Sequence, residues 1–356
     1  MASVDLPVRP ASAHRPGHFT IRTRYLALRI NIRVLGLTLI ALAVLAVVGI
    51  WAMTLGSFPI PYTDVARAVL GVGSDDQMFV VRTLRLPRVL SAVLIGMCLA
   101  MSGAIFQGLA RNPLVSPDII GIDAGATVVA MVWIISGRPY SLLPVGAFIG
   151  AVAAAAIIYG LSWKRGVSPS RLILVGIGVG EVISAFSTYV TLKFPIEVVR
   201  PAIVWTMGSI YGSTWRDVQI LLGCLLIVTP IAVSLMWKLR ALQLGNDAAR
   251  SLGMSIEAVQ GGLIITGCAF AASAVAIAGP IGFVALMIPH IARMIAGPMS
   301  GSVLLFTAVL GAIFLLVSDV VGQHFLPVTL PVGVVTAAVG APYFLFLMYR
   351  SAKLNM

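Results

Sequence analysis

The polar stretch at 238–257 holds side chains suited to binding another protein, and it separates two long apolar runs. Short helical turns are predicted at 241–244 and 247–252, with a glycine after each (Gly245 and Gly253). Helices of a bundle are usually joined by about 2–8 residues, and this stretch is longer. We interpret it as a docking surface for a soluble partner, while an amphipathic loop resting on lipid headgroups stays an alternative. Its apolar side chains are Leu242, Leu244, Ala248, Ala249 and Leu252, beside Arg240, Asp247 and Arg250.

Charged residues inside apolar runs are candidate functional groups, because a charge within the bilayer is costly. Glu181 follows Gly176, Gly178 and Gly180 in one such run. Contact with a transported solute and an interhelical hydrogen bond explain this carboxylate equally well. The three glycines permit close backbone approach or hinging. Asp319 lies near the end of a later run, and we interpret it as structural.

The remaining reactive side chains favour packing over chemistry. His290 and Arg293 lie three residues apart on one helical face, without a second ligand for a metal ion. The cysteines lie singly inside apolar runs, which is typical of small core residues. The sequence contains no G-x-x-x-x-G-K-[ST], no H-E-x-x-H and no G-x-S-x-G motif. We therefore expect no catalytic, cofactor or metal site in this chain. The three cysteines are Cys98, Cys224 and Cys268.

The elements that position these residues are apolar helices. Mean hydropathy is +1.03, 59% of residues are hydrophobic and 10% are charged, whereas soluble domains contain about 25% charged residues. Apolar runs of about 20 residues recur, which predicts an all-α integral membrane protein. The net charge is +12, but the basic residues lie at helix ends instead of in one patch. We attribute them to membrane topology and expect no nucleic-acid partner.

About ten crossings are predicted within a transmembrane domain at 34–350. A basic cytoplasmic tail without regular structure precedes it at 1–33, and a short cytoplasmic end follows at 351–356. Both termini are placed inside because most basic residues then fall on the cytoplasmic side. Arg82, Arg85 and Arg88 cluster on the opposite side, which indicates a use there. The crossings are expected at about 34–55, 89–109, up to 136, 142–163, 172–192, up to 237, 259–278, 281–296, 303–322 and 332–349.

Several motifs make the chain resemble the permease family of bacterial ABC importers for iron-siderophores, haem and cobalamin. They occur in family order over roughly 60–350, and within the family the chain is most similar to the second permease of ferric-enterobactin-type systems. The resemblance implies the fold of type II ABC importer permeases. The matching stretches are Arg85-Leu-Pro-Arg88, Ser102-Gly-Ala-Ile-Phe-Gln107, Arg111-Asn-Pro-Leu114, Pro117-Asp118, Ala249-Arg-Ser-Leu-Gly253, Ala278-Gly-Pro-Ile-Gly-Phe283, Pro289-His-Ile-Ala-Arg293 and Leu330-Pro-Val-Gly-Val-Val-Thr336.

The resemblance also implies partners. Two permease subunits would surround one pathway, with an ATPase dimer in the cytoplasm and a substrate-binding protein outside. ATP and Mg²⁺ would be bound by the ATPase. The stretch at 238–257 matches the coupling loop of the family, which sits in a groove of the ATPase. By this resemblance the ATPase contact would involve Leu244, Gly245, Ala248, Ala249, Arg250, Ser251, Leu252 and Gly253.

Arg85 and Arg88 match family positions that face carboxylates of the binding protein, although ordinary snorkelling at the membrane interface also explains them. The third basic position of the family is Gln323 here, with His324 beside it, which puts a third ion pair in doubt. The helix that carries Glu181 lines the pathway in the family. Pathway or gate residues would then be Gly176, Gly180, Glu181, Tyr189 and Phe194.

The function that follows is ATP-driven import of a ferric-siderophore across the bacterial inner membrane. Haem or cobalamin is an alternative cargo. A rival of another class is a stand-alone secondary transporter, which the helix break at Gly279-Pro280 would suit. The sequence leaves open whether the second permease is a related chain or another copy of this one.

Overall fold

The computed structural model describes residues 18–22, 27–164 and 168–354. Within these residues eight helices are long and apolar enough to cross a membrane, and two shorter apolar helices accompany them. The shorter two are α5 (Ile122–Ile135) and α12 (Val284–Ala296). These ten helices confirm the predicted all-α membrane fold of about ten crossings.

The segment before the first crossing differs from the prediction. Strands β1 (His18–Arg22) and β2 (Ala27–Asn31) form an antiparallel ribbon in which Phe19 faces Ile30 and Ile21 faces Leu28. Part of the tail that was predicted to lack regular structure is therefore paired. Apolar residues alternate in both strands, and over five residues this period-two pattern is too short to predict a strand by itself. The rest of the predicted tail, 1–17 and 23–26, lies outside the described residues.

Helix α1 (Ile32–Thr54) begins directly after the ribbon, two residues earlier than predicted. The side chain of Asn31 accepts a hydrogen bond from the backbone N–H of Arg33 and so caps the helix. Two short helices follow, α2 (Tyr62–Val69) and α3 (Asp75–Phe79). A π-helical turn, η1 (Val80–Arg85), then joins α3 to α4 (Leu86–Ala110), so this span is longer than the predicted 89–109.

Helix α4 lies at the centre of the bundle, and 83% of its most apolar window is buried. It packs against α9, α11, α12 and α13. A methyl carbon added at Gly103 would lie 1.8 Å from the carbonyl oxygen of Ala285, and one added at Gly96 would lie 2.3 Å from that of Gly311. Glycine at these two positions lets the α4 backbone touch the α12 and α13 backbones directly.

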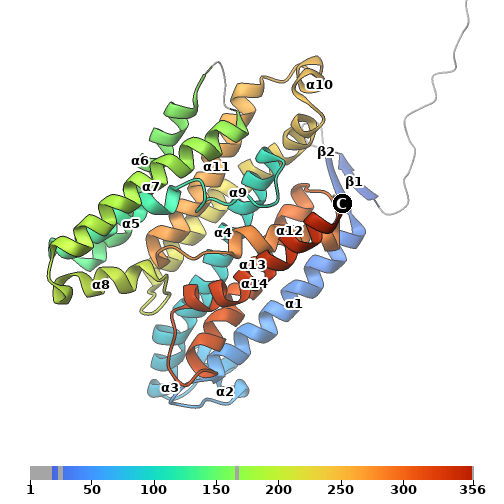
Figure 1. Ribbon diagram of the computed structural model, residues 1–356. Helices are drawn as coiled ribbons and strands as arrows, with labels where there is room; N and C mark the ends of the chain where they lie inside the picture. The colour runs from blue at the N-terminus through green and yellow to red at the C-terminus, as the bar shows by residue number, and fades with distance from the viewer. Residues whose placement is uncertain (1–17, 23–26, 165–167, 355–356) are drawn as a thin grey trace, which may run out of the picture.

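The other helices follow the predicted order. A 3₁₀ turn, η2 (Tyr140–Leu142), leads into α6, and α10 lies between α9 and α11. In Figure 1, α5 to α8 gather on one side, α1, α13 and α14 lie on the other, and α4, α9 and α11 run between them. The bounds are α6 (Leu143–Ser162), α7 (Pro169–Lys193), α8 (Ile196–Thr206), α9 (Trp215–Gln243), α10 (Asn246–Ser251), α11 (Ile256–Ala278), α13 (Gly301–His324) and α14 (Val332–Leu354).

Helix α9 continues beyond the predicted end near residue 237, so the turn expected at 241–244 is mainly its last turn. Leu239 and Leu242 remain buried there, at 1% and 4% exposure. The alternating lysine and arginine at 238 and 240 did not end the helix, because long basic side chains reach solvent from a helix surface. The predicted break after Ala278 is confirmed, since α11 ends there and Gly279 has a positive φ of 70°.

The bundle has two distinct ends (Figure 1). Helix α10, the β ribbon and the last turn of α14 lie at one, which we call the α10 end. Helices α2 and α3 lie at the other, the α2 end. Among the spans, α1 and α7 are the least covered by the rest of the chain, with 11% of each apolar window buried. Helix α7 therefore leaves most of its surface to neighbours outside this chain.

We expect Gly103→Ala to destabilise the folded chain, because its methyl group would overlap the carbonyl of Ala285. Overpacking of this kind costs about 1–3 kcal/mol. The matched control is Gly36→Ala in α1, where an added methyl group meets nothing within 4 Å. Thermal unfolding of both purified variants in detergent measures the difference, and equal midpoints would contradict the close approach of α4 and α12.

Candidate functional site

Helix α10 forms a small exposed projection between the ends of α9 and α11. Gly245 precedes it and Gly253 follows it, with positive φ values of 122° and 74° that suit glycine. Leu244 and Leu252 flank the helix and are 77% and 65% exposed. Apolar side chains this exposed at a helix–helix connection favour contact with another surface.

The structure divides the predicted coupling residues into two groups. Ala249 is fully buried and holds α10 against the bundle, so it is not part of the outer surface. Arg250 and Asp247 are exposed beside the two leucines. Ser251 is the last residue of α10, and the side chain of Ala248 lies outside the described part. The outer surface therefore combines two leucines with one positive and one negative side chain.

The base of this projection is bonded to the end of α4. Helix α4 stops at Ala110 because Arg111 adopts a left-handed conformation with φ of 53°. The Nη2 group of Arg111 donates a hydrogen bond to the carbonyl oxygen of Leu242 in α9. Gln243 Nε2 donates to the carbonyl oxygen of Gly108 at 3.1 Å. Two side-chain bonds, one from each helix, thus hold the end of α9 to the end of α4.

A buried amide extends this connection from α4 to α12. Gln107 Nε2 donates to the carbonyl oxygens of Ala285 and Leu286 at 3.2 and 2.8 Å. Its Oε1 accepts a bond from Arg293 Nη2 at 2.5 Å. Arg293 was predicted only to pack, and no role was predicted for Gln107, although an amide at the end of the apolar run Ser102–Gln107 is a usable signal. His290 lies near Tyr343 of α14, with ring centroids 6.3 Å apart.

The predicted docking arginines lie at the α2 end, and both are bonded within the chain. Arg85 donates from Nη1 to the carbonyl oxygen of Met53 and from Nη2 to that of Phe58, each at 2.6 Å. These bonds hold the last turn of α1 and the segment after it against η1. Arg82 of the same cluster is exposed, and its carbonyl oxygen accepts a bond from Trp215 Nε1 at 2.9 Å.

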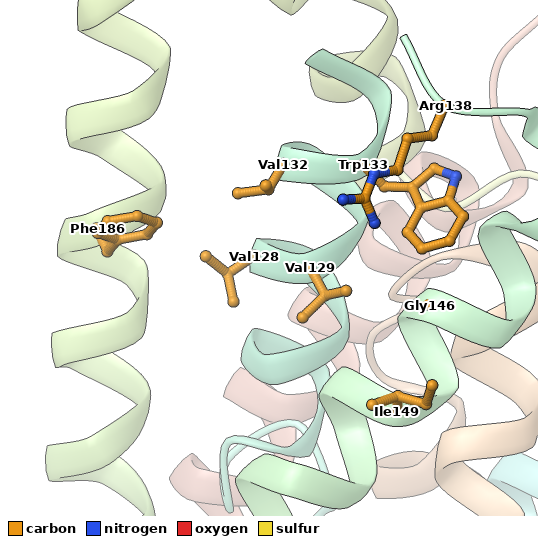
Figure 2. Close-up of a pocket in the computed structure, with 8 residues that line it drawn as sticks. All are labelled: Val128, Val129, Val132, Trp133, Arg138, Gly146, Ile149 and Phe186. Carbon is orange, nitrogen blue, oxygen red and sulfur yellow. The ribbon is translucent and has the colours of Figure 1, made fainter. Parts of the chain in front are cut away.

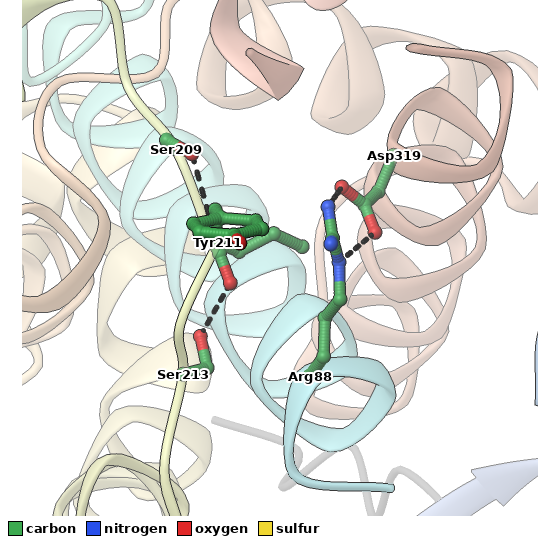
Figure 3. A network of polar contacts seen from close by, with 6 residues as sticks. Arg88, Ser209, Tyr211, Ser213 and Asp319 are labelled. Carbon is green, nitrogen blue, oxygen red and sulfur yellow. Dashed lines mark hydrogen bonds and ion pairs between the residues drawn. The ribbon is translucent and has the colours of Figure 1, made fainter. Parts of the chain in front are cut away.

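Arg88 forms a two-bond ion pair with Asp319 of α13 (Figure 3). The Nε–Oδ2 and Nη2–Oδ1 distances are 2.9 and 2.7 Å, and the side chains are 20% and 9% exposed. The guanidinium carbon lies 5.9 Å from the ring centroid of Tyr211. Gln323 follows Asp319 by one helical turn and is partly exposed. The structural role expected for Asp319 is thus to hold Arg88 against α13.

Two of the predicted pathway residues, Glu181 and Tyr189, lie on the part of helix α7 that this chain leaves uncovered. Glu181 is exposed and has no hydrogen bond or ion pair to any described residue. Ser184 and Thr188 are also exposed and share its helical face. The interhelical hydrogen bond considered for Glu181 is therefore absent within the described chain. Its polar face is available to another subunit or to a solute.

The glycines of α7 serve packing on one side of the helix. A methyl carbon added at Gly176 would lie 2.5 Å from the carbonyl oxygen of Ile120, whereas Gly178 meets nothing within 4 Å. Gly180 lies over Gly121 at an ordinary contact distance of 3.6 Å. Tyr189 and Phe194, near the α2 end, are 55% and 39% exposed. Gly176 and Gly180 thus let α7 pack against the segment at Ile120 and Gly121, and the two aromatic side chains lie outside that contact.

The sequence profile of the FecCD transport family matches residues 44–350. The chain belongs to this family. A permease protein assigned to a siderophore transport system, YfhA of Bacillus subtilis, is 42% identical over 322 residues, which cover 88% of this chain and 94% of that protein. The ferric enterobactin transport system permease protein FepG of Escherichia coli is 37% identical over 325 residues, covering 90% and 98%.

A solved structure supports the same assignment for this FecCD permease. It is described as a metal-chelate type ABC transporter in an inward-facing conformation, and it is 30% identical with a TM-score of 0.79. The match covers 89% of this permease and 98% of that chain. The prediction that this chain is a membrane permease of the ABC importer class is confirmed. The rival hypothesis of a stand-alone secondary transporter is not supported.

We expect the ion pair of Arg88 and Asp319 to show strong coupling in a double-mutant cycle. Arg88→Met alone leaves a poorly solvated carboxylate without its partner, which costs about 1–3 kcal/mol. Arg88→Met combined with Asp319→Leu removes both charges and should be closer to the unsubstituted permease. Thermal unfolding in detergent gives the stability of the unsubstituted permease, of each single variant and of the double variant. If the effects of Arg88→Met and Asp319→Leu simply added, the ion pair would be contradicted.

Proposed function

We propose that this permease forms half of the pathway of an ATP-driven importer for ferric-siderophores, and that α10 couples it to a cytoplasmic ATPase. The observation that carries the proposal is an exposed projection with a bonded base. Leu244 and Leu252 offer apolar contact, and Arg250 offers a charge that fixes orientation. A projection without such anchoring would bend under load instead of moving the helices.

Hydrogen bonds at the α10 end connect α10 to the membrane helices, so that a movement of α10 driven by the ATPase can reach them. A displacement of α10 reaches the end of α9, and the bonds of Arg111 and Gln243 carry it to α4. Gln107 then connects α4 to α12 and Arg293. Discrete packing arrangements of connected helices are the usual basis of two-state access. In this proposal ATP and Mg²⁺ are bound and used by the ATPase dimer and not by this chain.

The orientation of the permease follows from its charges. With both termini and α10 inside, 16 of the 24 lysines and arginines of the sequence fall on the cytoplasmic side, which favours this orientation. The α2 end then faces outward in a bacterial inner membrane. Among the basic residues of the described segments at the α10 end are Arg111, Lys164, Arg171, Lys238, Arg240, Arg250 and Arg293.

The uncovered surface of α7 suits the middle of a two-subunit assembly. Glu181, Ser184 and Thr188 offer polar groups to a hydrated chelate, and a second permease would complete the wall. That second permease is a related chain or another copy of this one. Tyr189 and Phe194 would narrow the outer part of this pathway.

Arg88 is the residue best placed to meet the substrate-binding protein. Asp319 engages its Nε and Nη2 groups, and among the described contacts Nη1 is left to donate to a carboxylate of a docking protein. The ion pair holds the guanidinium in one orientation, which lowers the entropy lost on docking. Gln323, one turn further along α13, adds an uncharged polar side chain to this surface.

We expect Arg250→Ala with Leu252→Ala to abolish uptake of a radiolabelled ferric-siderophore while membrane insertion is retained. ATP hydrolysis by the assembled transporter should no longer respond to the loaded binding protein, because the projection loses its charge and its apolar contact. Uptake in cells and ATPase activity in proteoliposomes are the two measurements. Unchanged uptake would refute the role of α10.

The matched control for this experiment is Arg67→Ala with Leu226→Ala. Both residues are exposed, but Arg67 lies on α2 and Leu226 on the surface of α9 remote from α10. This variant should retain coupled transport. The unsubstituted transporter is also assayed with haem and with cobalamin, and preferred uptake of either would replace the ferric-siderophore as cargo.

We expect Arg88→Met to weaken docking of the binding protein about tenfold or more, with a dependence on salt. The double variant Arg88→Met/Asp319→Leu should regain stability but not docking, which separates loss of the contact from loss of folding. Surface plasmon resonance on the reconstituted transporter measures the affinity, with Arg67→Ala as the control. Full docking by the double variant would show that Arg88 has only a structural role.

A further inference from the structure

An apolar groove of about 360 Å³ runs between α5, α6 and α7 near the α2 end. Figure 2 shows Phe186 of α7 on one side of the groove, facing Val128 and Val132 of α5 across an open space. Several of its side chains are open to the surroundings, with exposures of 44% for Val132 and 50% for Phe186. The lining is Val128, Val129, Val132, Trp133, Gly146, Ile149, Phe186 and Arg138.

The floor of the groove is built by a close contact between two helices. A methyl carbon added at Gly146 of α6 would lie 2.8 Å from the Trp133 indole. Glycine therefore lets the indole pack directly against the backbone of α6. Ile149, one turn further along α6, is 59% exposed and continues the apolar wall. Apart from Arg138, every lining side chain is hydrocarbon or indole, which suits a hydrocarbon chain.

One end of the groove carries a positive charge. The guanidinium carbon of Arg138 lies 4.9 Å from the Trp133 ring centroid, and Trp133 Nε1 donates to the carbonyl oxygen of Pro139 at 3.1 Å. Stacking holds the guanidinium at the mouth of the groove (Figure 2). Arg138 is exposed and forms no ion pair with any described residue. Its charge is thus available to an anion.

We propose that this groove binds one acyl chain of an anionic phospholipid, with the lipid phosphate on Arg138. The groove opens from helices that span the bilayer, and tryptophan is typical of the depth at which chains meet headgroups. Arginine binds phosphate through two parallel N–H donors. A basic side chain at a groove between membrane helices favours a lipid of net negative charge over a zwitterionic one.

A bound lipid would account for an exposed apolar groove that has no part in the transport mechanism proposed above. The lipid chain would fill the space between Phe186 and α5, and so would support α7 on the side away from Glu181. Another permease subunit is the competing occupant. Its contacts would be expected to cover a neutral apolar surface, whereas Arg138 places an uncompensated charge at the mouth.

Quenching of Trp133 by lipids that carry bromine on their acyl chains tests the inference, because bromine quenches an indole only on contact. The full-length permease is placed in phosphatidylcholine nanodiscs containing a minority of dibrominated phosphatidylglycerol or of dibrominated phosphatidylcholine. Subtraction of the Trp133→Phe spectrum isolates this indole among the six tryptophans of the chain. We expect binding of the anionic lipid to be about fivefold stronger.

Two substitutions, each with a control, distinguish binding of the lipid headgroup from binding of the acyl chain. Arg138→Gln should remove the preference for the anionic lipid, whereas Arg67→Gln, an exposed arginine at the same end, should keep it. Val132→Phe should fill the groove and reduce quenching by both lipids. Ile157→Phe should not, because Ile157 is exposed on α6, at 53%, but lies outside the groove.

Three outcomes would overturn the inference. Trp133 could be unquenched by either lipid, so that no chain enters the groove. Both lipids could quench equally with no effect of Arg138→Gln, so that the charge selects nothing. Quenching could also disappear when the second permease is assembled with this chain, which would make the groove a subunit interface.

Discussion

Direct backbone contact between α4 and its neighbours is the constraint on which the rest of this permease depends. Gly96 lies against Gly311 and Gly103 against Ala285, so α4 touches α13 and α12 without intervening side chains. In a bilayer, helices associate through such packing and through hydrogen bonds, since lipid offers no hydrophobic drive between them. The helices at the edge, α1 and α7, can remain largely uncovered because the centre is so closely packed.

Polar bonds sit at both ends of this central helix. At the α2 end Arg88 holds Asp319 of α13, and at the α10 end Gln107 holds the backbone of α12 and the guanidinium of Arg293. Each bond joins α4 to a helix that it also touches through glycine. A helix bonded to its neighbours at both ends moves with them as a unit, which is the property that the coupling proposed for α10 requires.

The outer helices are adapted to different neighbours. Helix α7 presents Glu181 on one face and Phe186 on another, so one side suits water or a polar cargo and the other suits hydrocarbon. Arg138 and Trp133 lie at one end of this hydrocarbon side, where we propose that a lipid headgroup binds. In the proposed assembly, this helix with little support from its own chain would obtain its position from the membrane and from a second subunit.

Hydropathy and glycine placement alone determined the membrane class, the ten apolar helices, the break at Gly279 and the short helix between α9 and α11, because these are local properties of the chain. The paired strands at 18–22 and 27–31 were not predicted, since five-residue alternation is a weak signal. Only the tertiary structure decided that Arg88 pairs with Asp319 and that Gln107 receives Arg293, across separations of 231 and 186 residues. It also decided which face of α7 borders a groove. The physical reason is that residue type predicts what a side chain can bind, whereas helix packing decides what lies within its reach.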